Sequence, residues 1–287
     1  DGRPAGGISQ VDVINVDDRT TFTSIGNAFS DGTAMFRVPP GTYAVHGYLF
    51  TYDEPHVYAE EGVAALEPEI AVTGDTEVVL DARSAAPIEV DTPEPSAPEL
   101  VALSYMRADS LGSSYSHSFI LSPPIDEAFA TPTEKVQTGD FEFYSGMTLQ
   151  APPIRMTVTE PDEQVLDVQY AFNAARLDGH LETELVHAGL GAPEDYASID
   201  VEGKIAFVQR GELTFADKIA NAEAAGAVAI VIYNNVPGLL LIGSNPDQLP
   251  TLTMNQSDGD ALAALMNDGA LDVTVDAVTV SPYLYET

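Results

Sequence analysis

The feature that most constrains the fold is a strand–turn–helix–strand pattern in the last third of the chain. Residues 205–208 form an apolar run of strand-forming residues that ends at a turn. Thr214 and Asp217 have the spacing of a capping box, in which a hydroxyl and a carboxylate satisfy free amides at the start of a helix. Gly226 ends that helix, and the apolar run 227–232 predicts a strand buried on both faces. This order predicts a βαβ unit with two parallel strands and a right-handed crossover helix.

A second helix and a further strand are expected after the βαβ unit. Residues 258–266 place apolar side chains on one helical face, with Ser257 as the expected cap and Gly269 as the stop. Residues 271–275 have the composition of a strand. The last third of the chain is therefore expected to fold as an α/β module.

The segment Gly203–Asn234 resembles the signature of the protease-associated domain, a non-catalytic α/β module found mostly attached to secreted peptidases. The resemblance extends over residues 168–276 and includes Gly-Leu-Gly at 189–191. Leu213 stands where many relatives carry a cysteine. Because this chain has no cysteine, no disulfide can brace that turn.

The charge balance and the absence of cysteine exclude several function classes. The chain of 287 residues carries 11 lysines and arginines against 45 aspartates and glutamates, a formal net charge of −34. Such a charge repels nucleic acid and anionic membranes. A thiolate metal site and a cysteine nucleophile are also excluded. No apolar run approaches 18 residues, so no membrane insertion is expected.

Residues 1–84 read as short strands separated by turns, which predicts a small β-sandwich. Pro39-Pro40-Gly41 forms a tight turn, and Thr42-Tyr43 begins the return strand. This piece resembles the regulatory-like β-sandwich attached to carboxypeptidases. In that family a first strand precedes the position of Gly2 to Pro4, and the sequence here is expected to lack it.

The middle of the chain is expected to hold a linker and a second β-domain. Residues 85–99 combine four prolines with acidic residues, which predicts an extended linker. Strand-like runs return in residues 100–167 and again in 277–287, and these two segments are predicted to form the second β-domain. The protease-associated domain, residues 168–276, is inserted in it or follows it. The predicted fold class is multidomain and mainly β, with two β-sandwich-like domains and one α/β module.

Catalytic motifs are absent from the sequence. Neither Gly-x-Ser-x-Gly nor the Gly-Thr-Ser of subtilisin-like nucleophiles occurs, and no His-Glu-x-x-His marks a zinc site. His117 lies between two serines, but a histidine on a strand surface is the favoured interpretation. We therefore expect no catalytic residue in this chain.

Metal binding is a weaker possibility. His180, Glu182 and Glu184 would share one face of a strand and could hold a metal, although a solvated surface is favoured. Carboxylate pairs such as Asp53-Glu54 leave calcium open, but none has the spacing of a strong calcium loop. No cofactor and no metal ligand are assigned.

A binding site is expected in the loop after the second parallel strand, because open α/β sheets bind ligands at the carboxyl ends of their strands. The candidate peptide-binding or protein-binding residues are Tyr233, Asn234, Asn235, Leu239 and Leu241. A turn followed by a packed loop explains the same residues at least as well. Arg210 and Lys204, rare positive charges here, are each expected to pair with a carboxylate.

The combined architecture is similar to the non-catalytic region of large secreted subtilisin-like serine peptidases of bacteria. That resemblance implies an accessory region that positions protein substrates, limits access to an active site or mediates domain association. The implied partners are a protein or peptide substrate and the catalytic domain of the parent chain, and the implied location is secreted or at the cell surface. A zinc aminopeptidase parent and a cell-surface adhesion protein without peptidase activity remain the alternatives.

Overall fold

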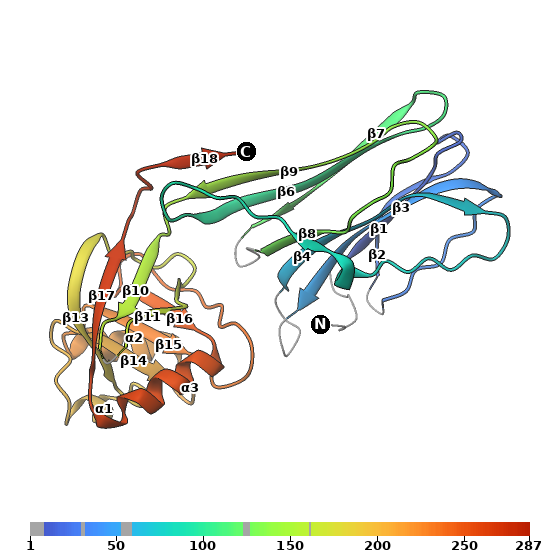
Figure 1. Cartoon of the computed structure of the whole chain (residues 1–287). Coiled ribbons are helices and arrows are strands. Elements are labelled where there is room, and N and C mark those ends of the chain that lie inside the picture. Colours follow the sequence, from blue (N-terminus) through green and yellow to red (C-terminus); the bar gives the residue numbers. More distant parts are fainter. Residues whose placement is uncertain (1–8, 30–31, 53–58, 123–126, 161) are drawn as a thin grey trace. The chain divides into compact units, whose positions relative to one another are not determined.

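The chain forms two compact units. The computed structural model describes residues 9–29, 32–52, 59–122, 127–160 and 162–287 (Figure 1). One unit comprises Asp1–Gln150 and Tyr283–Thr287, and is called the sandwich unit below. The other comprises Ala151–Pro282 and is called the α/β unit. In sequence, the α/β unit is therefore inserted between two segments of the sandwich unit.

The sandwich unit contains two sheets that are antiparallel except for the parallel pair β4–β8. The six-stranded sheet has the order β2-β1-β3-β4-β8-β5, and the four-stranded sheet has the order β18-β9-β6-β7. The strands of the first sheet are β1 (Gln10–Asn15), β2 (Thr23–Ala28), β3 (Gly41–Tyr52), β4 (Ala59–Val72), β5 (Ala86–Pro87) and β8 (Glu127–Ala130); those of the second are β6 (Ala97–Ala108), β7 (Ser114–Leu121), β9 (Phe141–Gln150) and β18 (Leu284–Glu286). A short 3-10 helix, η1 (Ala82–Ser84), precedes β5.

These two sheets share one apolar core instead of forming two separate sandwiches. Ile14 and Tyr48 from the first sheet pack in the same cluster as Leu103 and Met147 from the second. The predicted division between residues 1–84 and 100–167 therefore does not follow the packing. The physical reason is that the facing apolar residues of the two sheets are buried most fully when the sheets pack against each other. The other face of the six-stranded sheet carries two smaller apolar clusters.

The proline-rich stretch 85–99 also differs from the expected extended linker. Its residues include β5, which pairs with β8, and the beginning of β6. Ile88 and Val90 pack against the shared core of the sandwich. Pro87 is tolerated here because β5 is an edge strand, where a missing amide donor costs no ladder bond. Residues 34–38 and 77–80, which belong to the strand pattern predicted for residues 1–84, do not join a sheet.

The α/β unit has one eight-stranded sheet of order β11-β10-β17-β13-β14-β15-β16-β12. The strands β13 to β16 run parallel, and the remaining pairs are antiparallel. The strands are β10 (Ile154–Val158), β11 (Gln164–Leu166), β12 (Gln169–Tyr170), β13 (Gly179–His187), β14 (Ile205–Gln209), β15 (Ala229–Tyr233), β16 (Thr251–Met254) and β17 (Leu271–Ala277); the helices are α1 (Pro193–Tyr196), α2 (Phe215–Ala224), α3 (Gln256–Leu265) and the 3-10 turn η2 (Met266–Asp268). The predicted βαβ unit is confirmed as β14, α2 and β15.

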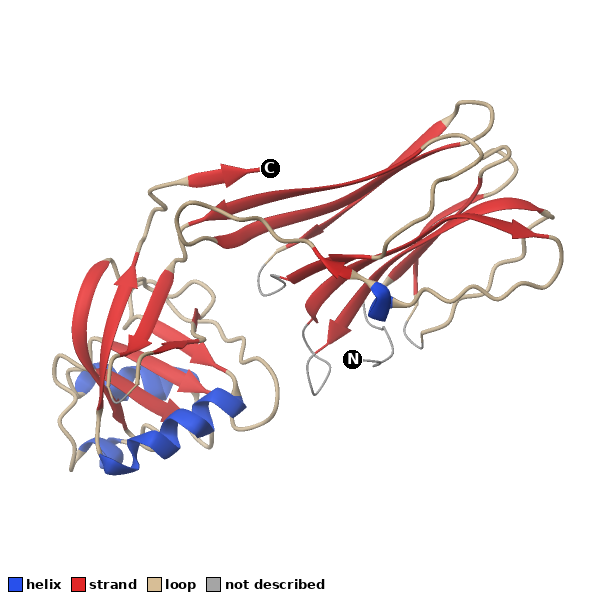
Figure 2. Ribbon diagram, viewed as in Figure 1, coloured by secondary structure: helices blue, strands red, loops and turns tan. Residues whose placement is uncertain are grey.

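Helices α2 and α3 cover opposite faces of the parallel strands (Figure 2). On β14, Phe207 packs in the core that includes Leu262 of α3, and Val208 packs in the core that includes Ile219 of α2. Alternation along β14 explains this, because successive side chains point to opposite faces of a sheet. Thr214 caps α2 as expected. The mainly β, multidomain fold class with one α/β module is confirmed.

The α/β unit begins earlier than the predicted boundary at residue 168. The strand β10 supplies Ile154, Met156 and Val158 to the core beneath α3, and pairs with β17. The chain enters and leaves the unit through neighbouring positions, since the amide of Ala151 donates to Ser281 Oγ at 2.9 Å. In the described part of the chain, no helix has the length and apolarity needed to cross a membrane.

Candidate peptide-binding edge of the parallel sheet

The candidate site is the edge of the α/β unit at which the four parallel strands end. Because β13, β14, β15 and β16 run in the same direction, the loops that follow them emerge at a common edge. The loops after β14 and β15 contain Arg210 and Asn234. The buried polar side chains of Lys218 and Asn234 fix the shape of this edge.

Lys218 on α2 ties together the loops after β13 and β14. Its side chain is fully buried, and its ammonium group donates to the carbonyl of Leu190 and, at 2.8 Å, to that of Gln209. Asn221, one turn further along α2, donates to the carbonyl of Gly191 at 2.9 Å. Burial lowers the pKa of Lys218, because removing the ammonium from water disfavours its charged form. Lys218 and Asn221 therefore fix the backbone of the loop after β13 and of the end of β14 at this edge.

Asn234 performs the same role in the loop after β15. Its amide group donates to the carbonyls of Gly238 (3.1 Å) and Leu239 (3.3 Å). Its oxygen accepts from Arg210 Nη1 at 3.1 Å and from the amide of Asn235 at 3.0 Å. Every hydrogen-bonding position of this buried side chain is thus used within the unit. Asn234 shapes the loop, and its side chain has no donor left for a ligand.

The other predicted site residues divide into buried and accessible groups. Tyr233 is buried in the core and stacks on Phe207 with ring centroids 4.6 Å apart. Asn235 is exposed, and Leu239 and Leu241 are half-buried. Asn235, Leu239 and Leu241 are therefore accessible to a peptide at this edge, whereas Tyr233 packs beneath the loop.

Sequence reasoning did not identify Lys218 and Asn221 as residues of this edge. A signal was present, because Lys218 lies three residues after Phe215 and four before Ala222, on the apolar side of α2. A lysine on the buried face of a helix requires partners inside the protein. The carbonyls at the ends of neighbouring parallel strands are the acceptors within reach.

Arg210 and Lys204 have different partners, although both were expected to pair with carboxylates. Lys204 Nζ lies 2.6 Å from Glu184 and 3.6 Å from Asp200, as predicted. In the described residues Arg210 instead bonds Asn234, and its guanidinium carbon lies 6.0 Å from the ring centroid of Phe215. The prediction for Arg210 is wrong because the nearest loop supplies an amide oxygen and an aromatic face.

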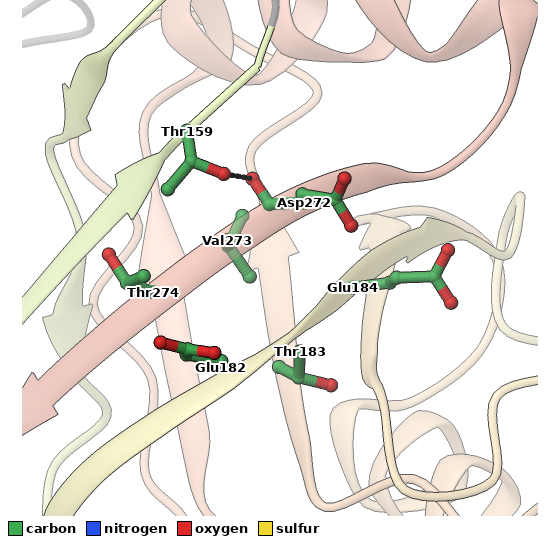
Figure 3. A pocket seen from close by; sticks show the side chains of 7 residues that line it. All are labelled: Thr159, Glu182, Thr183, Glu184, Asp272, Val273 and Thr274. Carbon is green, nitrogen blue, oxygen red and sulfur yellow. Dashed lines mark hydrogen bonds between the residues drawn. The ribbon is translucent and has the colours of Figure 1, made fainter.

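The outward face of β13 and β17 carries a shallow polar hollow (Figure 3). It is lined by Thr159, Glu182, Thr183, Glu184, Asp272, Val273 and Thr274. The hydroxyl of Thr159 donates to the carbonyl of Asp272 at 3.2 Å, and Glu184 is held by Lys204. The carboxylates of this face are spread along two strands instead of converging on one point.

His180 lies on the same outward face and pairs with carboxylates. Its Nδ1 is 2.7 Å from Asp276, and its Nε2 is 3.6 Å from Glu182. The hydrogen bond to Asp276 is the main cause of the raised pKa of His180. No three histidines, aspartates or glutamates of the described residues form a group that could hold a metal ion. The carboxylate pair Asp53-Glu54, considered for calcium, lies outside the described residues.

His117 is not the strand-surface histidine that the sequence suggested. Its Nδ1 lies 2.5 Å from the buried carboxylate of Asp12, which also accepts from Tyr105 at 2.6 Å. Ser116 and Ser118 point to the opposite face of β7, since neighbouring residues of a strand alternate. Neither flanking serine can therefore be activated by His117 as a nucleophile.

Comparison with known proteins gives the class of the α/β unit. Residues 181–262 match the family model of the PA domain, so this unit contains a PA domain. A 105-residue stretch is 38% identical to the minor extracellular protease Vpr of Bacillus subtilis (strain 168), covering 37% of this chain and 13% of Vpr. An 86-residue stretch is 43% identical to aminopeptidase YwaD of the same organism, covering 29% of this chain and 19% of YwaD.

Among solved structures, an aminopeptidase from Aneurinibacillus sp. strain AM-1 aligns with 49% of this chain and 34% of its own. The aligned residues are 28% identical and the TM-score is 0.39. The chain spans less than a fifth of the length of Vpr and of YwaD. Vpr and YwaD are thus named as peptidases, and each is much longer than the stretch it shares with this chain.

Proposed function

We propose that this chain is a non-catalytic region of a larger secreted peptidase, in which the PA domain helps to position protein substrates, limits access to the active site or mediates domain association. The observation that carries the proposal is the PA domain at residues 181–262, in a chain whose relatives are named as peptidases. The site geometry supports a binding role, because Lys218 and Asn234 fix the loops while Asn235 and Leu241 stay accessible.

We further propose that the parent is a subtilisin-like serine peptidase, secreted or held at the cell surface. The feature in favour is the combination of a β-sandwich unit with a PA domain, which is similar to the non-catalytic region of large secreted subtilisin-like serine peptidases. A zinc aminopeptidase parent is the second candidate, and the 43% identity to aminopeptidase YwaD favours it. Both inferences rest on domain analogy, and the residues of the chain assign no catalytic role.

The accessory role can be tested by removing the α/β unit from the full-length protein. The amide of Ala151 contacts Ser281 Oγ, and Gln150 pairs with Leu284, so residues 151–283 can be replaced by an Asn-Gly turn. We expect kcat/KM for casein to fall at least fivefold while kcat/KM for a short chromogenic peptide stays within twofold. Equal activity on both substrates before and after the deletion would contradict the accessory role.

The class of the parent is tested separately on the same full-length protein. A serine-directed sulfonyl fluoride should abolish hydrolysis, whereas the zinc chelator 1,10-phenanthroline should not. Inactivation by the chelator alone would replace the subtilisin-like parent with a zinc aminopeptidase. No hydrolysis of either substrate by the intact protein would favour an adhesion protein.

A further inference from the structure

The edge strand β7 is longer and more regularly paired than the other edge strands of the described sheets. The three sheets end in the strands β2, β5, β7, β11, β12 and β18. Four of these edge strands have only two or three residues, and β2 pairs with β1 through an irregular register. The eight residues of β7 pair with β6 without any irregularity (Figure 1). Long, regular edge strands are unusual because their unpaired backbone groups attract other strands.

The sequence of β7 also lacks the features that usually protect an edge. Its residues, Ser-Tyr-Ser-His-Ser-Phe-Ile-Leu, include no lysine, carboxylate, proline or glycine. This is notable in a chain in which 20% of residues are charged. Natural edge strands are commonly blocked by lysine, proline or a bulge, and none of the three is present here.

The pairing of β6 shows which backbone groups of β7 face outward. The amide of Ala108 donates to Asp140 on the side of β9, whereas the amide of Asp109 donates to Ser113 on the side of β7. Because such bonds alternate along a strand, the odd-numbered residues of β6 bond to β7. Their partners, including His117 and Phe119, are the odd-numbered residues of β7.

The even-numbered residues of β7 therefore present their amides and carbonyls at the free edge. These residues are Ser114, Ser116, Ser118 and Ile120. All four are exposed, and no other backbone group of the described residues bonds to them from outside the sheet. The free edge of β7 therefore presents a row of alternating backbone donors and acceptors. The row is about 20 Å long, at about 3.3 Å per residue over six residues.

We propose that β7 binds an extended polypeptide segment as an added fifth strand of the four-stranded sheet. A row of alternating backbone donors and acceptors is matched only by the backbone of another strand. The net charge of −34 opposes pairing with a second copy of the chain and favours a basic segment. The small side chains of Ser116 and Ser118 leave room on the outer face for partners of varied size. The proposal does not depend on a peptidase parent.

Amide hydrogen exchange tests the proposal on the unmodified chain. The probe is a synthetic ten-residue peptide of alternating threonine and valine flanked by two lysines at each end. Without it, the amides of Ser116, Ser118 and Ile120 should exchange at least tenfold faster than those of His117 and Phe119. At saturating peptide the first three should slow at least tenfold. A matched peptide with proline at alternate positions should have no effect.

Two variants separate backbone pairing from side-chain contact. Ser116→Pro removes an outward amide at a position where an edge strand tolerates proline, and should weaken peptide affinity at least tenfold. Ser116→Ala keeps the amide and should bind within twofold of the unmodified chain. If Ser116→Pro does not fold, the exchange measurement still decides the outcome.

Three results would overturn the proposal. The first is an unchanged exchange rate of the outward amides at saturating peptide. The second is equal loss of affinity in Ser116→Pro and Ser116→Ala. The third is protection that appears without peptide and grows with protein concentration, because it would identify a second copy of the chain as the partner.

Discussion

Three buried polar side chains show a difference between the two units. In the α/β unit, buried Lys218 donates to two carbonyls, and Asn234 uses all of its hydrogen-bonding groups. In the sandwich unit, buried His46 has no partner on either ring nitrogen among the described residues, and Nη2 of Arg107 also lacks one. Lys218 and Asn234 thus fix loops of the α/β unit, whereas His46 stays neutral in the interior of the sandwich unit.

The environment of His46 explains why the sandwich unit can bury a histidine whose ring nitrogens have no hydrogen-bond partner among the described residues. Its ring lies 4.3 Å from that of Tyr105 and 5.3 Å from that of Phe141. Burial and, secondarily, the charge of Arg107 lower the pKa of His46 to about 3. The ring therefore packs as an uncharged aromatic group near neutral pH, which costs less than burying an unpaired charge.

The sharpest test of this difference is Lys218→Ala. The substitution leaves the carbonyls of Leu190 and Gln209 without their donor and opens a cavity beneath the edge. We expect the α/β unit to lose about 3 kcal/mol of unfolding free energy. Urea titration followed by tyrosine fluorescence measures this, with exposed Lys135→Ala as the control. Equal losses of unfolding free energy in the two variants would contradict the role of Lys218 in fixing the two backbone segments.

A second test compares close packing in the two units. A Cβ at Gly259 on α3 would lie 2.3 Å from a ring carbon of Tyr233, whereas one at Gly62 would meet the flexible end of Leu121 at 2.6 Å. Gly259→Ala should therefore cost about 2 kcal/mol, and Gly62→Ala about 1 kcal/mol. Gly243→Ala, with no atom within 4 Å of the added carbon, is the control. Thermal unfolding of the three variants measures these losses of stability. A larger loss in Gly62→Ala than in Gly259→Ala would contradict the expected order.

The third test uses pH. Because the pKa of His46 is about 3 in the folded chain and about 6.5 when unfolded, the unfolded state binds more protons between these values. The stabilising effect is complete above pH 6.5 and is lost as the pH falls toward 3. We expect the sandwich unit to lose about 1.4 kcal/mol between pH 7.5 and 5.5 from this residue.

The control for the pH test is His46→Phe, which keeps an aromatic ring between Tyr105 and Phe141. Chemical denaturation at the two pH values should show a smaller loss in this variant, because phenylalanine does not titrate. An identical pH dependence in both proteins would mean that His46 takes up its proton in the folded state as readily as in the unfolded one.

Local features of the fold were predictable from the sequence. The helix α2 was predicted from its cap and apolar spacing, since Thr214 and Asp217 act within one turn. The start of α3 was misplaced because two neighbouring residues can cap it. Asn255 accepts the amide of Asp258, and the expected cap Ser257 donates to the same oxygen.

Longer-range features were harder to predict. The prolines of residues 85–99 suggested a linker, but the apolar side chains between them belong to a core assembled from strands far apart in sequence. At the candidate site, Asn234 was expected to contact a ligand. Composition alone could not show that the carbonyls of Gly238 and Leu239 accept hydrogen bonds from the amide group of Asn234. The path of a loop depends on its backbone angles.

The insertion of the α/β unit has a consequence for synthesis on the ribosome. The strand β18 pairs with the end of β9, where Leu284 lies opposite Gln150, but the ribosome makes it only after all of residues 151–282. The inserted unit contains its own cores and can fold while the four-stranded sheet still lacks β18. Vectorial translation thus orders the two folding events, and a pause near residue 282 would leave β9 as a temporarily open edge for cotranslational partners.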